Sequence, residues 1–156
     1  MVQVEGLGRY LAEHPFLKDM SQDSRGIVVG CAANEVFKAG EVIFREGGPA
    51  DKFYLIRNGA VAIEVHVPGH EALVVETLHD GDILGWSWLI APYKWAFDAR
   101  ANEVTRVISL DGKCLRAKCE ADPKLGYEIY KRFIPVMAHR LSETRHRLIE
   151  TITDGD

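Results

Sequence analysis

The middle of the chain, residues 35–112, consists of short β-rich runs separated by turns that contain glycine. No long crossover helix is predicted between these runs, so the pattern gives no indication of a parallel α/β sheet. Many short strands with turn signals at close intervals are typical of a β-sandwich or a β-roll. The predicted strands cover residues 36–37, 42–44, 53–56, 61–67, 73–78, 82–84 and 104–110.

The dipeptide Asn58-Gly59 lies between two of these runs. Asn-Gly is a strong short-range signal for a hairpin, because both residues readily adopt the positive φ angles of a tight two-residue turn. We therefore expect the runs on either side of this dipeptide to be neighbouring strands of one antiparallel sheet.

Helical patterns flank the β-rich region, and the chain is expected to form a single domain over residues 1–156. Residues 1–34 form the predicted helical lead-in, in which Ser21, or alternatively Ser24, caps a short helix. Residues 35–112 form the roll. The remaining predicted segment, 113–153, contains the C-terminal helices.

The C-terminal region begins with a short turn-rich segment and continues with a helix that Asp122 caps and Pro123 opens. Pro135 predicts a kink or a fresh helix start. Leu125, Ile129 and Phe133 fall on one face of this helix, which is the spacing of residues that pack against a core.

A second set of side chains on the last helix recurs at intervals of four, three and four residues, so these side chains form a stripe along one face. It is either an intramolecular packing face or the seam of a two-helix dimer, and two heptads are too few to distinguish these arrangements. A homodimer through this helix is the expected assembly. The stripe consists of Met137, Leu141, Thr144 and Leu148.

Three stretches, residues 37–47, 50–61 and 81–85, together resemble the cyclic-nucleotide-binding domain of catabolite-activator-type regulators, kinase regulatory subunits and cyclic-nucleotide-gated channels. The resemblance implies a mainly β fold: a double-stranded β-helix, or jelly roll, with N-terminal helices and a long C-terminal helix. It also implies a regulatory domain that senses a small ligand. The chain is expected to be a divergent member that lacks a DNA-binding domain.

In that family, residues 81–101 would form the phosphate-binding cassette, in which a glycine, here Gly85, precedes a short helix with free N–H groups. A Glu after the glycine and an Arg before the next strand usually complete the site; this sequence has Trp86 and Trp95 there, with Lys94 beside the second. Losing both charged groups costs roughly 3–5 kcal/mol, so tight binding of cAMP or cGMP is not expected. The candidate ligand-binding residues are Leu84, Gly85, Trp86, Ser87, Trp88, Lys94, Trp95, Ala96, Phe97 and Thr144.

The tryptophans Trp86, Trp88 and Trp95 have two interpretations. Their indoles either fill the cavity that the ligand would occupy, because they bury large apolar areas, or they line a pocket for a flat or apolar ligand. Lys94 is the best candidate for a replacement cation. Thr144 lies where family members contact the ligand base, although it is equally an ordinary polar residue of the helix seam.

Alternation along the strand that follows the cassette argues against Arg100 as the missing cation. Successive side chains of a strand point to opposite faces, so Phe97, Ala99 and Ala101 point inward. Arg100 then points outward, where we expect it to pair with Asp98 on the surface.

Other functions have less support. No Gly-x-Ser-x-Gly elbow or Gly-x4-Gly-Lys-Ser/Thr loop is present, so we do not expect an enzyme. The pair His66 and His70 has the wrong spacing for a cupin-type metal site, which remains a distant alternative, and no metal or cofactor is expected.

The sparse cysteines Cys31, Cys114 and Cys119 are expected to be buried or idle thiols.

The net charge of −4 and the absence of targeting signals limit which partners are expected. The segment 123–152 is mildly basic while the rest of the chain is acidic. This charge distribution does not favour binding to nucleic acid, because such binding depends on neutralising phosphate charges. The sequence has no secretion signal and no apolar run of membrane-spanning length, so we expect a cytoplasmic protein that does not contact membranes. Two functions stay open: a small-ligand sensor, or a ligand-free module that docks or dimerises.

Overall fold

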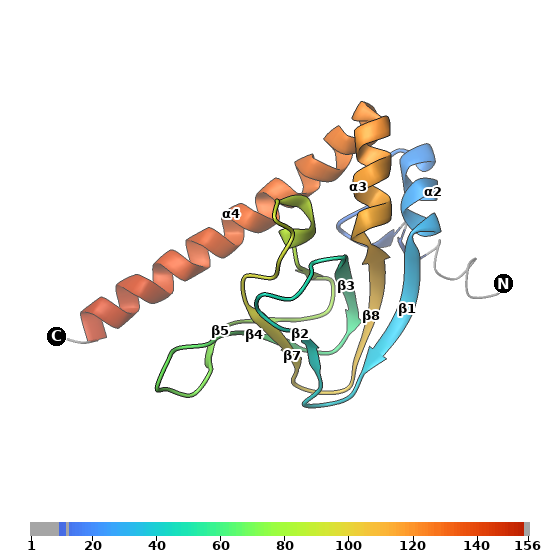
Figure 1. The fold of residues 1–156 in the computed structure, drawn as a ribbon. Coiled ribbons are helices and arrows are strands. Elements are labelled where there is room, and N and C mark those ends of the chain that lie inside the picture. The colour runs from blue at the N-terminus through green and yellow to red at the C-terminus, as the bar shows by residue number, and fades with distance from the viewer. Residues whose placement is uncertain (1–9, 12, 155–156) are drawn as a thin grey trace.

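The computed structural model describes residues 10–11 and 13–154, and its centre is a roll of two four-stranded antiparallel sheets (Figure 1). Successive strands alternate between the sheets, except that the fourth and fifth form a hairpin within one sheet. This wrapping is the jelly-roll arrangement, so the predicted fold class is confirmed. The first sheet has the order β1 (Ala32–Phe37), β8 (Thr105–Asp111), β3 (Lys52–Asn58), β6 (Ile83–Leu84), and the second β2 (Val42–Phe44), β7 (Asp98–Ala101), β4 (Val61–Val65), β5 (Leu73–Leu78).

The connection at Asn58-Gly59 is not a hairpin turn, so that prediction is wrong. It carries the chain from β3 in one sheet to β4 in the other. Gly59 has a φ of +136°, and a Cβ placed on it would lie 2.5 Å from Thr105 Oγ1 and 2.7 Å from Thr105 Cα. Its N–H donates to Asp80 Oδ1 at 2.8 Å. The glycine is therefore required for the close approach of β8 rather than for a two-residue turn.

The lead-in helix α2 (Gln22–Gly30) begins where the sequence predicts, because Ser21 is its N-cap and accepts a hydrogen bond from the Ser24 N–H. The strand β1 then begins at Ala32, inside the stretch that the sequence assigned to the helical lead-in. The segment expected to be a short turn-rich connection is instead a full helix, α3 (Gly112–Ala121), which Asp111 caps.

The C-terminal helix α4 (Pro123–Asp154) runs without a break through Pro135, so a fresh helix start at this residue is not observed. Proline removes one backbone hydrogen bond from a helix interior. The helix continues because Phe133 and Val136, on either side of Pro135, both pack against the core and hold the axis in place. At its start, Asp122 Oδ1 accepts from the Lys124 N–H at 3.1 Å, as the capping signal predicts.

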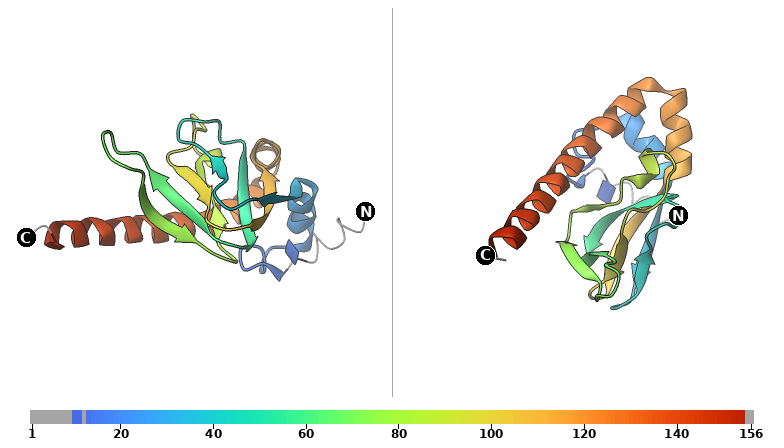
Figure 2. Two further views of the ribbon diagram at one scale, coloured as in Figure 1. Left: turned by 90° about the horizontal axis from the view of Figure 1, so that it is seen from below. Right: turned by 60° about the vertical axis from the view of Figure 1, so that its left-hand side comes forward.

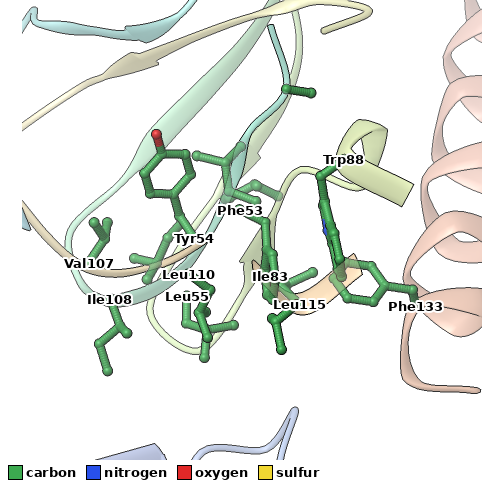
Figure 3. Close-up of a cluster of buried hydrophobic side chains, with 14 of the residues drawn as sticks. Phe53, Tyr54, Leu55, Ile83, Trp88, Val107, Ile108, Leu110, Leu115 and Phe133 are labelled. Carbon is green, nitrogen blue, oxygen red and sulfur yellow. The ribbon is translucent and has the colours of Figure 1, made fainter. Parts of the chain in front are cut away.

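An aromatic cluster connects α4 to the roll (Figure 3). Phe133 of α4 packs edge-on against Phe53 of β3 and against Trp88, with ring centroids 5.2 and 5.5 Å apart. Leu125 and Ile129 lie on the same face of α4 and are fully buried, which confirms the predicted packing face. Beyond Arg140, α4 extends past the roll as an arm (Figure 2), along which Arg147 Nη1 lies 3.5 Å from the Val74 carbonyl oxygen of β5. None of the helices in the described residues has the length and hydropathy needed to cross a bilayer.

Replacing Gly59 with Ala is expected to lower the free energy of unfolding by about 3 kcal/mol, because the new Cβ would overlap the backbone of Thr105 and the residue would keep its positive φ. Gly69→Ala is the matched control: Gly69 has a φ of +80° but nothing lies within 4 Å of its Cβ position, so a loss of about 1 kcal/mol is expected. Urea unfolding measures both variants, and equal losses would contradict the close-approach explanation.

Candidate functional site

The indole of Trp95 lies directly against Gly85, the glycine of the candidate cassette. Gly85 follows β6 with a φ of +96°, and a Cβ placed on it would lie 2.6 and 2.7 Å from Trp95 Cζ3 and Cη2. Trp95 is only 5% exposed. The six-membered ring of Trp95 therefore occupies the space immediately beside the glycine.

Trp95 is held in this position by both its side chain and its backbone. Its ring stacks on Phe44 of β2, with centroids 3.7 Å apart and planes 7° from parallel. The Trp95 N–H donates to the Gly48 carbonyl at 3.0 Å, and the Gly47 N–H donates to the Trp95 carbonyl at 2.9 Å. These contacts fix the indole between β2 and the glycine loop that follows it.

Trp88 belongs to the core that supports the cassette. It lies in the short 3₁₀ helix η1 (Ser87–Leu89), the expected short helix after the glycine, and it is fully buried. Its ring stacks on Phe53 at 4.7 Å (Figure 3), and its carbonyl accepts a hydrogen bond from Arg116. Trp88 thus anchors η1 to the roll and to α4. The side chain of Ser87 is buried beside it.

Trp86, the third tryptophan, faces α4 and is partly buried. Its ring meets Phe97 edge-on at 5.9 Å on one side. The guanidinium of Arg140 lies 4.9 Å from the Trp86 ring centroid, within the range of a cation–π interaction. Trp86, at the position where the resemblance implies a Glu, thus contacts the terminal helix.

Arg140 joins α4 to both sheets. Its Nη2 donates to the carbonyl oxygen of Ile83 in β6 at 2.7 Å, and its Nε lies 3.0 Å from Glu76 Oε2 in β5. The side chain is 9% exposed. Burial lowers the pKa of Arg140, and the carboxylates of Glu76 and Asp82 oppose this shift. A buried guanidinium needs a partner of opposite charge, so Glu76 is part of the same structural unit.

The other predicted site residues lie in different surroundings. Leu84 is fully buried in β6, and Phe97 is buried against Phe44. Lys94 and Ala96 are exposed on either side of Trp95, and a role of Lys94 as the replacement cation stays a prediction. Thr144 is exposed on the arm of α4, where it lines a groove with Leu141 and Leu148. A ligand contact by Thr144 stays a prediction.

The alternation predicted for the strand after the cassette is confirmed, because Ala99 and Ala101 of β7 are fully buried and Arg100 faces outward. The predicted partner of Arg100 is wrong. Arg100 Nε lies 3.5 Å from Glu64 Oε2 on β4, the neighbouring strand, while Asp98 accepts a hydrogen bond from the Glu46 N–H at 2.7 Å.

A groove of about 760 Å³ lies between α4, the segment before α2, and the β5–β6 region, and it includes Gly81, Asp82 and Ile83 at the start of the cassette. Its walls carry both charges: Lys131 and Arg132 on α4, and Asp19 and Glu76 opposite them. Its volume is in the range of small-molecule sites. Within the described residues, no group of three or more His, Cys, Asp or Glu is arranged to hold a metal ion.

Sequence reasoning missed Arg140 and Glu76. Arg140 follows Ile129, Phe133 and Val136 at 4-3-4 spacing, so it falls on the buried face of α4. A charged residue at the next position of an apolar face is a signal for a buried ion pair, and it could have identified Arg140. Nothing in the local sequence of β5 distinguishes Glu76 from a surface residue.

Comparisons with known proteins agree with this geometry. The sequence is 28% identical over 116 residues to the CRP-like cAMP-activated global transcriptional regulator of Mycobacterium tuberculosis, a match that covers 74% of this chain and 50% of the regulator. It is 31% identical over 104 residues to the cAMP-dependent protein kinase regulatory subunit of Dictyostelium discoideum, covering 63% of this chain and 32% of the subunit. The chain therefore spans half or less of the length of these two relatives.

A solved structure is similar over nearly its whole length. The crystal structure of a protein from Geobacter metallireducens, assigned there as cyclic nucleotide-binding, superimposes with a TM-score of 0.76 at 26% identity, covering 90% of this chain and 99% of that one. The model of the cyclic nucleotide-binding domain family matches residues 34–122, more than half of the chain. The two-sheet roll, its glycine cassette and this match together show that the chain belongs to the cyclic nucleotide-binding domain family.

Proposed function

We propose that this chain is a regulatory module whose cassette does not bind cyclic nucleotides tightly and which acts through its terminal helix. The observation that carries the proposal is the indole of Trp95 packed against Gly85. A cyclic phosphate bound over this glycine would have to displace a ring that is almost fully buried and stacked on Phe44. Displacing it would expose a large apolar surface, which opposes ligand binding.

The charges at the cassette support the same conclusion. The two positions that carry a Glu and an Arg in related domains hold Trp86 and Trp95, and the nearest cation along the chain, Lys94, is exposed to solvent. A charge-assisted hydrogen bond contributes about 1.5–3 kcal/mol, and the loss of two weakens affinity by roughly two to four decades. Steric closure by Trp95 adds to this loss.

Arg140 supports a role for α4 that is independent of a cyclic nucleotide. Its contacts with Ile83, Glu76 and Trp86 dock the helix on the cassette and on both sheets. We take these contacts to supply the docking that a bound ligand would otherwise provide. In this proposal the helix is held against the roll in the ligand-free protein.

The exposed side of α4 supports dimerisation as the output. Apolar side chains recur on it at seven-residue intervals: Tyr127, Ile134, Leu141 and Leu148 are between 61% and 72% exposed. Thr144 falls between the last two at the spacing of a second seam position, whereas Met137, the first residue of the predicted stripe, is half-buried against the core. Two copies of such a stripe can bury each other along a parallel or antiparallel helix pair. The proposed partner is therefore a second copy of this chain.

A second candidate function is a sensor for a small molecule other than a cyclic nucleotide. The groove of about 760 Å³ beside α4 favours it, because a ligand there would contact both Glu76 and the helix that carries Arg140. Native mass spectrometry of gently purified protein distinguishes the two candidates. The main proposal expects no added small-molecule mass, and a stoichiometric added mass would support the sensor.

The wild-type protein is expected to show no saturable binding of cAMP or cGMP below about 1 mM in isothermal titration calorimetry. The double variant Trp86→Glu, Trp95→Arg is expected to bind cAMP at least about ten-fold more tightly, because it frees the space beside Gly85 and restores two charged groups. Circular dichroism establishes that the variant is folded.

The variant Lys94→Arg is the matched control for this experiment. It places a guanidinium one residue away, on the exposed side of the same segment, and is expected to leave cAMP affinity unchanged. Micromolar binding by the wild-type protein would overturn the proposal. A folded double variant with no gain in affinity would show that Trp86 and Trp95 are not the obstacle.

Replacing Arg140 with Met is expected to lower the free energy of unfolding by about 2 kcal/mol, because Glu76 and the Ile83 carbonyl lose their partner. Hydrogen exchange is expected to accelerate in residues 136–154 more than in α3. Arg145→Met, on the exposed side of α4, is the control and should change neither measurement. Unchanged exchange in the Arg140 variant would mean that this contact does not hold the helix.

The double variant Leu141→Glu, Leu148→Glu is expected to be monomeric in size-exclusion chromatography with light scattering, while the wild-type protein is dimeric. Charges placed opposite each other in a helix seam repel and cannot be buried. His146→Glu, between them in sequence but outside the stripe, should leave the dimer intact. A monomeric wild-type protein would contradict dimerisation through α4.

A further inference from the structure

Two cysteines that are 83 positions apart in the sequence meet beside the roll. Cys31 is the C-cap residue of α2, and Cys114 lies in the first turn of α3. Their Sγ atoms are 2.6 Å apart. Neither thiol takes part in the cassette, in the groove or in the seam of α4, and sequence reasoning treated both as idle.

The backbone around this pair is held by β-sheet and capping hydrogen bonds. Ala32, the residue after Cys31, pairs with Leu110 in the ladder between β1 and β8. The Asp111 N–H donates to the Cys31 carbonyl at 2.9 Å, and Asp111 Oδ1 accepts from the Cys114 N–H at 3.0 Å. The two Cα atoms are thus fixed relative to each other by the same strand end and helix cap.

We propose that Cys31 and Cys114 form a site of reversible oxidation, at which a peroxide converts the two thiols into an intramolecular disulfide. The sulfur atoms are already in contact, so the bond forms with only a small further approach of the two side chains. The expected reagent is hydrogen peroxide or a small organic hydroperoxide, because Cys31 is buried and Cys114 is only partly exposed.

The chemistry begins at Cys114, the more accessible sulfur. Its Sγ attacks the peroxide, the O–O bond breaks, and a sulfenic acid forms with release of water or an alcohol. Cys31 Sγ then attacks Cys114 Sγ, the S–S bond forms and the S–O bond breaks. The departing hydroxide takes the Cys31 proton as water, so the two thiols lose two electrons and the peroxide gains them.

The environment of Cys31 makes it the second sulfur to react rather than the first. Burial and the neighbouring Cys114 thiol raise the pKa of Cys31 to about 12, which disfavours its thiolate and its direct attack on the peroxide. Contact with Cys114 places the Cys31 sulfur against the sulfenic acid once that forms, and the hydroxide that leaves Cys114 accepts the Cys31 proton. A bulky disulfide reagent has no comparable access to the pair.

The proposed bond would close a loop around the whole roll. The strand β1 begins one residue after Cys31, and β8 ends three residues before Cys114, so all eight strands lie within the loop. Cross-links that close long loops stabilise a fold mainly by restricting the unfolded chain. Oxidation is therefore expected to raise the melting temperature without a change in fold.

The test compares reduced and peroxide-treated protein in the same buffer. Treated protein is expected to lose two of its three free thiols to alkylation, to give a linked peptide pair containing Cys31 and Cys114, and to melt at least about 5 °C higher. Dithiothreitol should reverse all three changes. The size-exclusion profile should stay the same, because the bond is intramolecular.

Cys119 provides the matched control. It is also a buried free cysteine, and burial raises its pKa to about 11, but Cys119→Ser should keep the full oxidation response. Cys31→Ala and Cys114→Ala should each abolish the thermal shift, measured against the same variant in reduced form so that any intrinsic destabilisation cancels. Unchanged thiol counts, a linkage through Cys119, or over-oxidation of Cys114 without a cross-link would each overturn the proposal.

Discussion

The contact between Phe133 and the Phe53–Trp88 pair positions the rest of the molecule. It brings together β3, the short helix after the cassette glycine, and α4. Arg140 lies seven residues further along the same face of α4, so the aromatic contact aims its guanidinium at Ile83 and Trp86. Together with the buried Leu125 and Ile129 on the same face, this anchor sets the register of the helix on the roll and so places the charged contact.

The cassette illustrates how a binding fold can be kept while its interior changes. The glycine, the short helix and the inward face of β7 are all present, and they are set by backbone geometry and packing. The space that they enclose beside Gly85 holds an indole stacked on Phe44 instead of charged side chains. Apolar packing there stabilises the closed roll, whereas an empty polar cavity would have needed water or a ligand to satisfy its buried groups.

Local signals in the sequence predicted local structure well. Ser21 and Asp122 are the caps of α2 and α4, and the inward-outward alternation near Ala99 is observed, because each depends on residues a few positions apart. The errors arose where distant segments decide the outcome. Gly59 looked like a hairpin glycine, but the approach of β8 and the wrapping of the roll determine its role.

The same limit applies to the candidate site. The glycine and the tryptophans of the cassette were identifiable from the sequence, but which way each indole points depends on Phe44 and Phe53, which are far away along the chain. The partner of Arg100 is on the neighbouring strand rather than on its own. The contact between Cys31 and Cys114 spans the entire roll, so no spacing rule could have indicated it.

The continuity of α4 through Pro135 has a mechanical consequence. By the rise of an α-helix, the arm beyond Arg140 is roughly 20 Å long. A stiff rod pivoting near its point of attachment converts a small tilt into a larger displacement at its tip, about 3–4 Å for a tilt of about 10° over that length. A small tilt of α4 at its contact with the roll would therefore reach the far end of the helix amplified, as a shift comparable to the size of a side chain.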